Sequence, residues 1–128
     1  MKRDMDLIRS LLLFLEERDD LSLIQASDIL IGDASQPQVQ YHLNLMFQAG
    51  LIDGEPVRST SSDRLIYVVP FALTWTGHEF LESVRDPEIW RQAKSGASKA
   101  GTAGIEFIWG LAKAALTRAI ADQTGVAL

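Results

Sequence analysis

Uncharged polar side chains recur along residues 36–48, at positions where they could hydrogen-bond an external partner. The set is Gln36, Gln38, Gln40, Tyr41 and Asn44. Amide and hydroxyl groups of this kind can hydrogen-bond base edges in a DNA major groove, and Gln and Asn are suited to adenine. The same groups cost less to remove from water than ions do, so they also fit a protein-binding face. A third interpretation is a solvated, uncharged helix face without a ligand.

Positive charge is missing from the stretch that carries these side chains. Residues 21–50 contain no Lys or Arg, against Asp28 and Asp33. Phosphate contacts by cations supply most non-specific affinity for DNA, and this stretch cannot supply them. Candidate cationic contacts lie elsewhere, at Lys2, Arg3, Arg58 and Arg64. Arginines beside a loop can contact a DNA backbone, but acidic neighbours favour solvated charges and local ion pairs here.

Catalytic and metal-binding chemistry finds little support in the sequence. There is no cysteine, which excludes disulfides, thiol catalysis and cysteine-ligated zinc. His78-Glu79 lacks the second histidine of a zinc-protease motif, and the other histidine, His42, is distant in sequence. We expect His42 to pack at the rim of the core or to reach outward. With no glycine-rich phosphate loop either, the sequence predicts a protein that is not an enzyme and uses no metal or cofactor.

Composition places the chain among globular proteins. Its 128 residues are 47% hydrophobic, which is enough for a real core. The charged N-terminus is not typical of a signal peptide, and no apolar run approaches a membrane span. With no cysteine, these features predict a cytoplasmic protein without membrane contact. The net charge of −5 lowers the expectation of duplex binding without forbidding it.

Outside residues 21–34, hydrophobic periodicity and capping signals predict five helices and one hairpin. We expect helices over 4–18, 35–49, from Thr74 or Thr76 to about 85, over 87–99 and over 105–122, with hairpin strands at 51–58 and 64–71. Ser35 suits an N-cap and Gly50 a helix end. This order predicts an α+β, mainly α chain, a winged helix-turn-helix with appended C-terminal helices. The predicted domains are residues 1–86 and 87–128.

Residues 21–34 fit two structures. A helix over 24–31 with a turn at Gly32 would complete a helix-turn-helix with the 35–49 helix. The β-branched run Ile29–Ile31 before Gly-Asp also suits a short strand beside the hairpin. We favour the helix followed by the turn.

Several apolar groups predict how the elements pack. Val39, Leu43, Met46 and Phe47 form the buried face of the 35–49 helix. The second hairpin strand is apolar on both faces, which predicts a covering element, and Pro70 should end its regular pairing. Trp75 and Trp90 are expected to anchor helix packing. Gly96, Gly101 and Gly104 indicate a linker before the last helix.

The last helix has an unusually wide apolar stripe along residues 105–120. Exposed apolar area of this size usually marks an interface, so the stripe predicts a homodimer. The alternative is a helix that folds back over residues 65–69 and Phe80 within one chain. Trp109, on this helix, fits either arrangement.

Three sequence blocks resemble a bacterial and prophage-associated family known only as a domain of unknown function. They are MKRDMDLIR, QVQYHLNLMFQAGLI and LTWTGHEFLESVRDPEIW, in order over roughly the first 90 residues. The resemblance implies a winged-helix fold and a bacterial or phage source, and it implies no activity or ligand. This chain differs at residues 35–39, where members often carry charge, and is one residue longer between Gly32 and His42. Members often have strand character where we favour the 24–31 helix.

These observations support two functions. The first is a small bacterial or phage-derived DNA-binding protein, a transcriptional regulator, with the 35–49 helix in the major groove and the hairpin at the backbone. The alternative is a winged-helix protein–protein interaction module without DNA binding. Fold class alone does not separate them.

Overall fold

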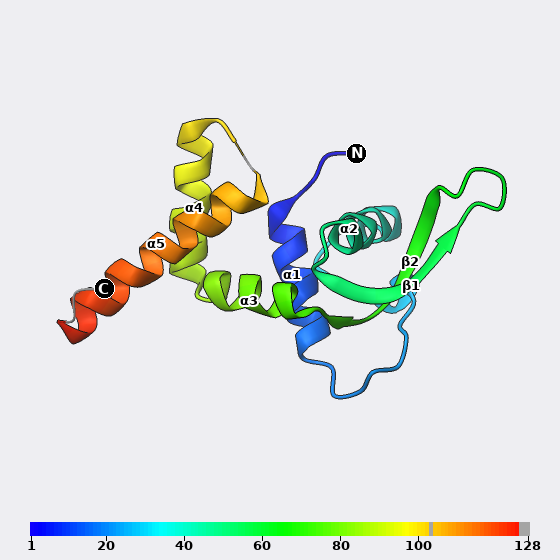
Figure 1. Ribbon diagram of the computed structural model, residues 1–128, viewed down its shortest axis with the longest axis horizontal. Coiled ribbons are helices and arrows are strands. Elements are labelled where there is room, and N and C mark those ends of the chain that lie inside the picture. Colours follow the sequence, from blue (N-terminus) through cyan, green and yellow to red (C-terminus); the bar gives the residue numbers. More distant parts are fainter. Residues whose placement is uncertain (103, 126–128) are drawn as a thin grey trace. The chain divides into compact units, whose positions relative to one another are not determined.

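The computed structural model describes residues 1–102 and 104–125 (Figure 1). Within these residues it contains α1 (Met5–Glu16), a 3₁₀ turn η1 (Ala26–Asp28), α2 (Gln36–Gln48), β1 (Ile52–Arg58), β2 (Leu65–Leu73), α3 (Trp75–Val84), α4 (Pro87–Ala100) and α5 (Ile105–Thr124). β1 and β2 form one two-stranded antiparallel sheet. The predicted α+β, mainly α class is confirmed.

The chain divides into two compact units, residues 1–78 and residues 79–128. The first unit holds α1, η1, α2, the hairpin and the start of α3. The second holds the rest of α3 with α4 and α5. The predicted domain boundary at residue 86 stays a prediction.

Local capping explains where α1 and α2 begin and end. The Asp4 carboxylate accepts hydrogen bonds from the backbone N–H groups of Asp6 and Leu7. Ser35 and Gln38 form a reciprocal capping box: the Ser35 hydroxyl accepts from the Gln38 N–H, and the Gln38 side chain accepts from the Ser35 N–H. α2 ends before Gly50, whose φ of +75° lies in the left-handed region. The predicted start and end of this helix are confirmed.

The helix favoured over residues 24–31 is wrong. Only the 3₁₀ turn Ala26–Asp28 forms there, and the residues around it are irregular. The Ile24 N–H donates to the Pro70 carbonyl at 3.2 Å, so this backbone pairs with β2 instead of starting a helix. Ile29 is buried while neighbouring Leu30 is 87% exposed. The turn at Gly32 is present, with φ +51°.

The hairpin contains a bulge where its second strand passes Pro70. Asp53 pairs with Ala72 and Gly54 with Pro70, which leaves one extra residue in β2. A Cβ on Gly54 would lie 2.5 Å from the Val69 carbonyl oxygen, so only glycine fits the close approach. Regular pairing does break at Pro70, but the strand continues to Leu73.

The core of the first unit lies where α1 and α2 pack on each other and on β2. The predicted core residues Val39, Leu43 and Met46 are buried, whereas Phe47 is half-buried. The predicted covering element of β2 is present, because α1 and α2 pack on it and Val68 and Val69 are buried, but the cover stops short of the strand's first residues. Ile66 and Tyr67 are 46% and 37% exposed, because this end of the hairpin projects away from α1 (Figure 1).

α3 begins under tight restraint from the end of α2. The Thr74 hydroxyl accepts from the Gly77 N–H at 3.0 Å and donates to the Gly50 carbonyl at 2.5 Å. The Thr74 N–H donates to the Leu51 carbonyl at 3.0 Å. Of the two predicted starts, Thr74 therefore caps α3, and Thr76 lies inside the helix. Trp75 is 80% exposed, so its predicted anchoring role is wrong.

In the second unit α5 packs against α4. Gly96 lies inside α4, not in a linker, and a Cβ there would meet the Leu111 side chain at 2.9 Å. Trp90 is buried as predicted. Trp109 donates from Nε1 to the Ser83 hydroxyl at 3.0 Å and meets Phe80 edge-on at 5.4 Å. Part of the α5 stripe is thus buried within one chain, and the homodimer through residues 105–120 stays a prediction.

Candidate functional site

Two of the candidate polar side chains on α2 are turned toward β2. The Gln40 amide nitrogen donates to the Val68 carbonyl at 3.2 Å and to the Asn44 side-chain oxygen at 3.1 Å. The Asn44 amide nitrogen donates to the Ile66 carbonyl at 3.1 Å. Base readout by these two amides stays a prediction, and it would require these bonds to break.

The hydrogen bonds from α2 belong to a row of contacts along one edge of β2, the edge that is not paired with β1. Alternate residues of a strand present their carbonyls to the same edge, so Ile66, Val68 and Pro70 face the same way. The Ile66 carbonyl accepts from Asn44, the Val68 carbonyl accepts from Gln40, and the Pro70 carbonyl accepts from the Ile24 N–H. A sheet edge with unpaired carbonyls invites pairing with other chains. The α2 amides and residue 24 therefore close this edge.

Replacing Asn44 by alanine tests this role. We expect Asn44→Ala to lower the free energy of unfolding by about 1 kcal/mol, because the Ile66 carbonyl loses its donor. The exposed Gln48→Ala on the same helix is the matched control and should stay within about 0.5 kcal/mol of the parent. Urea unfolding followed by circular dichroism measures both. Equal stabilities for the two variants would show that the edge contact contributes nothing.

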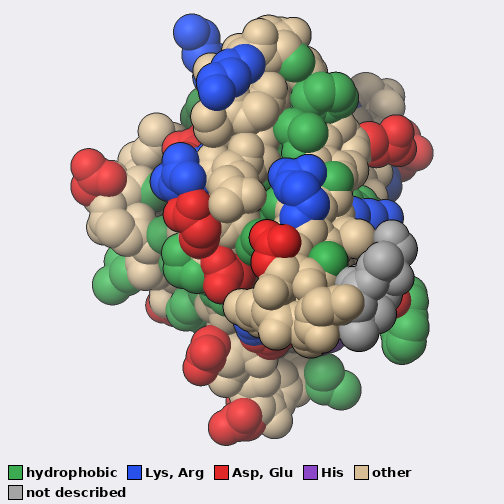
Figure 2. Space-filling model, turned by 90° about the vertical axis from the view of Figure 1, so that its left-hand side faces the viewer, with side chains coloured by type: hydrophobic (Ala, Val, Ile, Leu, Met, Phe, Trp, Pro, Cys, Tyr) green, Lys and Arg blue, Asp and Glu red, His purple; other side chains and the backbone are tan. Residues whose placement is uncertain are grey.

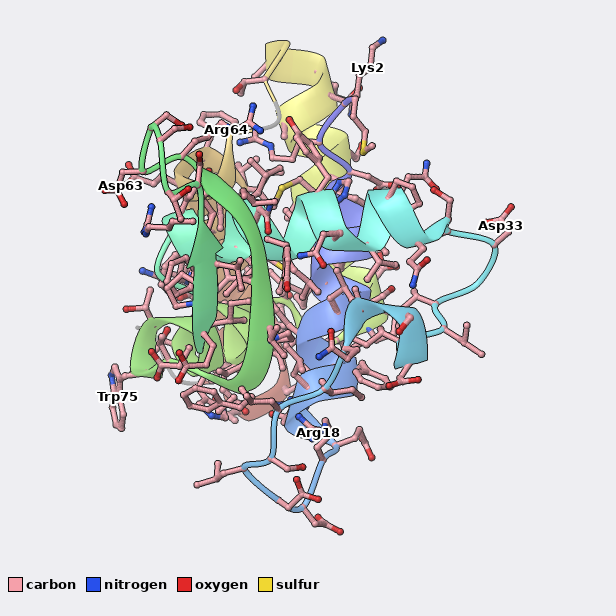
Figure 3. The ribbon with its side chains drawn as sticks, turned by 90° about the vertical axis from the view of Figure 1, so that its right-hand side faces the viewer. Lys2, Arg18, Asp33, Asp63, Arg64 and Trp75 are labelled. Atoms are coloured by element: carbon pink, nitrogen blue, oxygen red, sulfur yellow. The ribbon has the colours of Figure 1, made fainter. Side chains whose placement is uncertain are left out.

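A groove of about 430 Å³ lies between η1, the first turns of α2 and β2. Its lining residues carry no formal charge: Gln25, Ala26, Ser27, Gln36, Pro37, Gln40, Ile66 and Tyr67. Figure 3 looks toward this side of the first unit, with η1 beneath α2 and the hairpin beside them. The groove thus combines exposed apolar groups with amides and hydroxyls, as ligand and peptide sites commonly do.

The remaining α2 candidates have separate positions. Gln36 is exposed and lines the groove, whereas the Gln38 side chain is occupied by the capping box. Tyr41 is half-buried and meets His42 edge-on at 5.6 Å. His42 is only 1% exposed, which places it in the core and not at its rim or outside.

The four cationic candidates do not join the α2 face into one basic surface. Arg58 and Arg64 are exposed at the far end of the hairpin, where Arg58 donates to the Asp63 carbonyl at 3.4 Å. Figure 3 shows Asp63 next to Arg64, with Lys2 well apart from both. Arg3 is exposed near Lys2, and it has an interaction partner of its own.

The first unit carries the negative charge of the chain. Residues 1–78 hold eleven acidic and six basic side chains, so they account for the whole net charge of −5. In the second unit acidic and basic residues are equal in number. Figure 2 shows the face that carries the C-terminal helices, where basic and acidic side chains lie next to one another.

Arg18, just after the end of α1, is turned toward the loop that follows it. Arg18 donates from Nη2 to the Asp20 carboxylate at 3.3 Å and to the Ser22 carbonyl at 2.7 Å. Hydrogen bonds from the Ser22 hydroxyl and backbone N–H, with a smaller contribution from Arg18, lower the pKa of Asp20. Asp20 therefore stays ionised, and Arg18 presents little free charge to a ligand.

Sequence reasoning missed the residues that shape the groove on two sides. Gln25 and Ser27 were assigned to a helix, and Ile66 and Tyr67 were expected to be covered. A prediction of strand pairing for residues 22–28 would have brought them beside β2. Among the described residues, no group of three or more His, Asp or Glu side chains is arranged to hold a metal ion. No helix among them is long and apolar enough to cross a bilayer.

Comparison with known proteins identifies a family. Residues 2–103 match the model of a family described as "Hypothetical protein (DUF2513)". The chain belongs to this family. It is also 38% identical over 95 residues to an uncharacterized protein of Haemophilus influenzae, a match that covers 74% of this chain and 77% of that one. No solved structure matches. The resemblance to a domain of unknown function is confirmed, and neither description states an activity.

Proposed function

We propose that residues 1–78 form a winged-helix module whose groove binds a protein partner. The observation that carries this proposal is the uncharged, partly apolar lining of the groove, in a unit whose net charge is negative. Such a surface attracts polypeptide more readily than a phosphate backbone. The chain order of α1, a short turn, α2 and a hairpin supports the winged-helix assignment, with η1 in place of the first helix of a helix-turn-helix pair.

The internal bonds of α2 favour the same function. A recognition helix needs free donors and acceptors at the base edges. Gln40 and Asn44 already bond β2, and Gln38 already caps its own helix. Gln36 and Pro37, in contrast, line the groove from the exposed first turn. The end of α2 that remains available is therefore the end beside the groove.

DNA binding is the second candidate, because the hairpin exposes two arginines. Arg58 and Arg64 flank the loop of the wing, where cations can contact a DNA backbone. In this function α2 would enter the major groove, and the protein would be a small bacterial or phage-derived regulator. The eleven acidic residues of the unit oppose it electrostatically.

Parallel selections separate the two functions. The full-length protein is used to select from a random dodecapeptide library and from a random DNA duplex library at about 150 mM salt. We expect peptides to be enriched, and Tyr67→Ala to lose them because Tyr67 forms a groove wall. The exposed Gln48→Ala is the control and should retain them.

The opposite result would overturn the proposal. Enrichment of duplexes alone, with loss in an Arg58→Ala, Arg64→Ala double variant, would establish the DNA function. Peptides that bind Tyr67→Ala as well as the parent would place the protein-binding surface outside the groove.

A further inference from the structure

An acidic segment with exposed leucines borders the groove. Residues 19–34 contain Asp19, Asp20, Asp28 and Asp33 and no basic residue. Leu21, Leu23 and Leu30 in the same segment are 77%, 50% and 87% exposed. Isolated exposed leucines are ordinary, but three within ten residues, in a segment that also lines the groove, add exposed apolar surface beside it. Figure 3 shows this segment between Arg18 and Asp33.

The segment and the groove are continuous. The Ile24 N–H donates to the Pro70 carbonyl, which holds residue 24 at the edge of β2, one residue before the groove begins at Gln25. The following η1 turn forms one wall of the groove, opposite Ile66 and Tyr67. Asp28 directly follows the groove residue Ser27, and Leu23 lies two residues before Gln25, so an extended ligand in the groove would run close to both.

The negative charge of this border has little internal compensation. Arg18 is the only basic residue between residues 10 and 57, and its Nη2 is already occupied by Asp20 and Ser22. Asp28 and Asp33 are exposed. A positively charged partner would lower the repulsion among these aspartates and would be steered toward them as the two proteins approach.

We propose that the groove takes an extended protein segment in which basic and apolar side chains alternate. This inference rests on the proposed protein-binding function and specifies its partner. Apolar side chains of the ligand enter the groove between η1 and β2 and contact Leu23 and Leu30. Its Lys or Arg side chains lie against Asp28 and Asp33.

Three labelled octapeptides test the inference on the full-length protein by fluorescence anisotropy. They are alternating Leu-Lys, Ser-Lys and Leu-Ser, which supply both features, charge alone and apolar groups alone. We expect the Leu-Lys peptide to bind at least about ten-fold more tightly than either of the others, because apolar contact and rim charge act together. Its affinity should fall as salt rises from about 50 to 300 mM.

Matched charge variants locate the contact. Asp28→Asn with Asp33→Asn should weaken Leu-Lys binding by about three-fold or more, since two exposed ion pairs, each of modest strength, are lost together. Asp53→Asn with Glu55→Gln removes the same charge from exposed positions on β1 and should change it by less than about two-fold. Equal effects of the two double variants would show attraction to the overall charge and overturn the assignment to this border.

Each of the other possible outcomes also supports or overturns the inference. If Leu-Ser binds as well as Leu-Lys, the cationic partner is wrong while groove binding stands. If the Ser-Lys peptide binds as tightly as the Leu-Lys peptide, charge alone explains the binding and the groove has no part in the contact. If no peptide binds, the inference fails, and the library selection still decides the proposed function separately. If NMR shifts of Leu23 and Tyr67 depend on protein concentration without peptide, the occupant is a second copy of the chain, and the inference also fails.

Discussion

Replacing Gly77 by alanine should destabilise the protein by about 3 kcal/mol or more, at or beyond the upper end of usual overpacking effects. A Cβ at this position would lie 2.0 Å from the Leu51 carbonyl oxygen and 3.0 Å from its carbonyl carbon. The obstacle is backbone, so no side-chain rotation relieves it. The carbonyl is itself held in place, because it accepts the Thr74 N–H at 3.0 Å. Either the start of α3 or the start of β1 must move.

Gly110→Ala is the matched control, because it makes the same substitution inside another helix. Gly110 is exposed in α5, and a Cβ there would have no atom within 4 Å. Alanine is about 1 kcal/mol better than glycine in a helix interior, so this variant should be stabilised or unchanged. Urea denaturation of both variants gives the comparison. A Gly77→Ala variant as stable as Gly110→Ala would mean that α3 does not approach Leu51 this closely.

The sequence predicted those elements whose signals are local. Ser35 as N-cap and Gly50 as the residue after the helix mark the two ends of α2, and both caps form; the part that Gln38 plays in the first cap was not predicted. The helix prediction for residues 24–31 failed because their structure depends on a partner that is distant in the sequence. The Ile24 N–H finds its acceptor at Pro70, 46 positions later in the chain, and helical periodicity contains no trace of that pairing.

The candidate site shows the same division between local and long-range information. Gln40 and Asn44 have the residue types and spacing of a base-reading helix. The sequence alone does not show whether their amide groups donate to DNA bases or to backbone carbonyls of the same chain. The position of β2 decides that question, because its open edge lies within hydrogen-bond distance of both amides. Gln36, one turn before Gln40, makes neither of these bonds and lines the groove with its side chain exposed, whereas the groove-lining Gln40 has its amide nitrogen bonded to β2. One polar face of a helix therefore divides into a part that supports the fold and a part available to a ligand.

His42 illustrates how a polar residue becomes part of the core. Its Nε2 accepts the Asp4 N–H at 2.8 Å, and its Nδ1 lies 2.7 Å from the Gln38 carbonyl oxygen. A carbonyl only accepts, so the proton is assigned to Nδ1 and the ring is neutral in this arrangement. The ring thus joins the residue that caps α1 to the first turns of α2. It satisfies a backbone N–H that would otherwise lose its protein partner.

His42→Ala should therefore lower the free energy of unfolding by about 2–4 kcal/mol, from a cavity in the core and an unpaired Asp4 N–H. His42→Phe leaves no cavity but removes both hydrogen bonds and adds a somewhat larger ring, so it should cost about 1–3 kcal/mol. His78, the other histidine, is exposed on α3, and His78→Ala should stay within about 0.5 kcal/mol of the parent. Denaturant unfolding of the three variants separates packing from hydrogen bonding. If His42→Phe is as stable as the parent, the ring acts by volume alone and the link between the α1 cap and α2 contributes nothing.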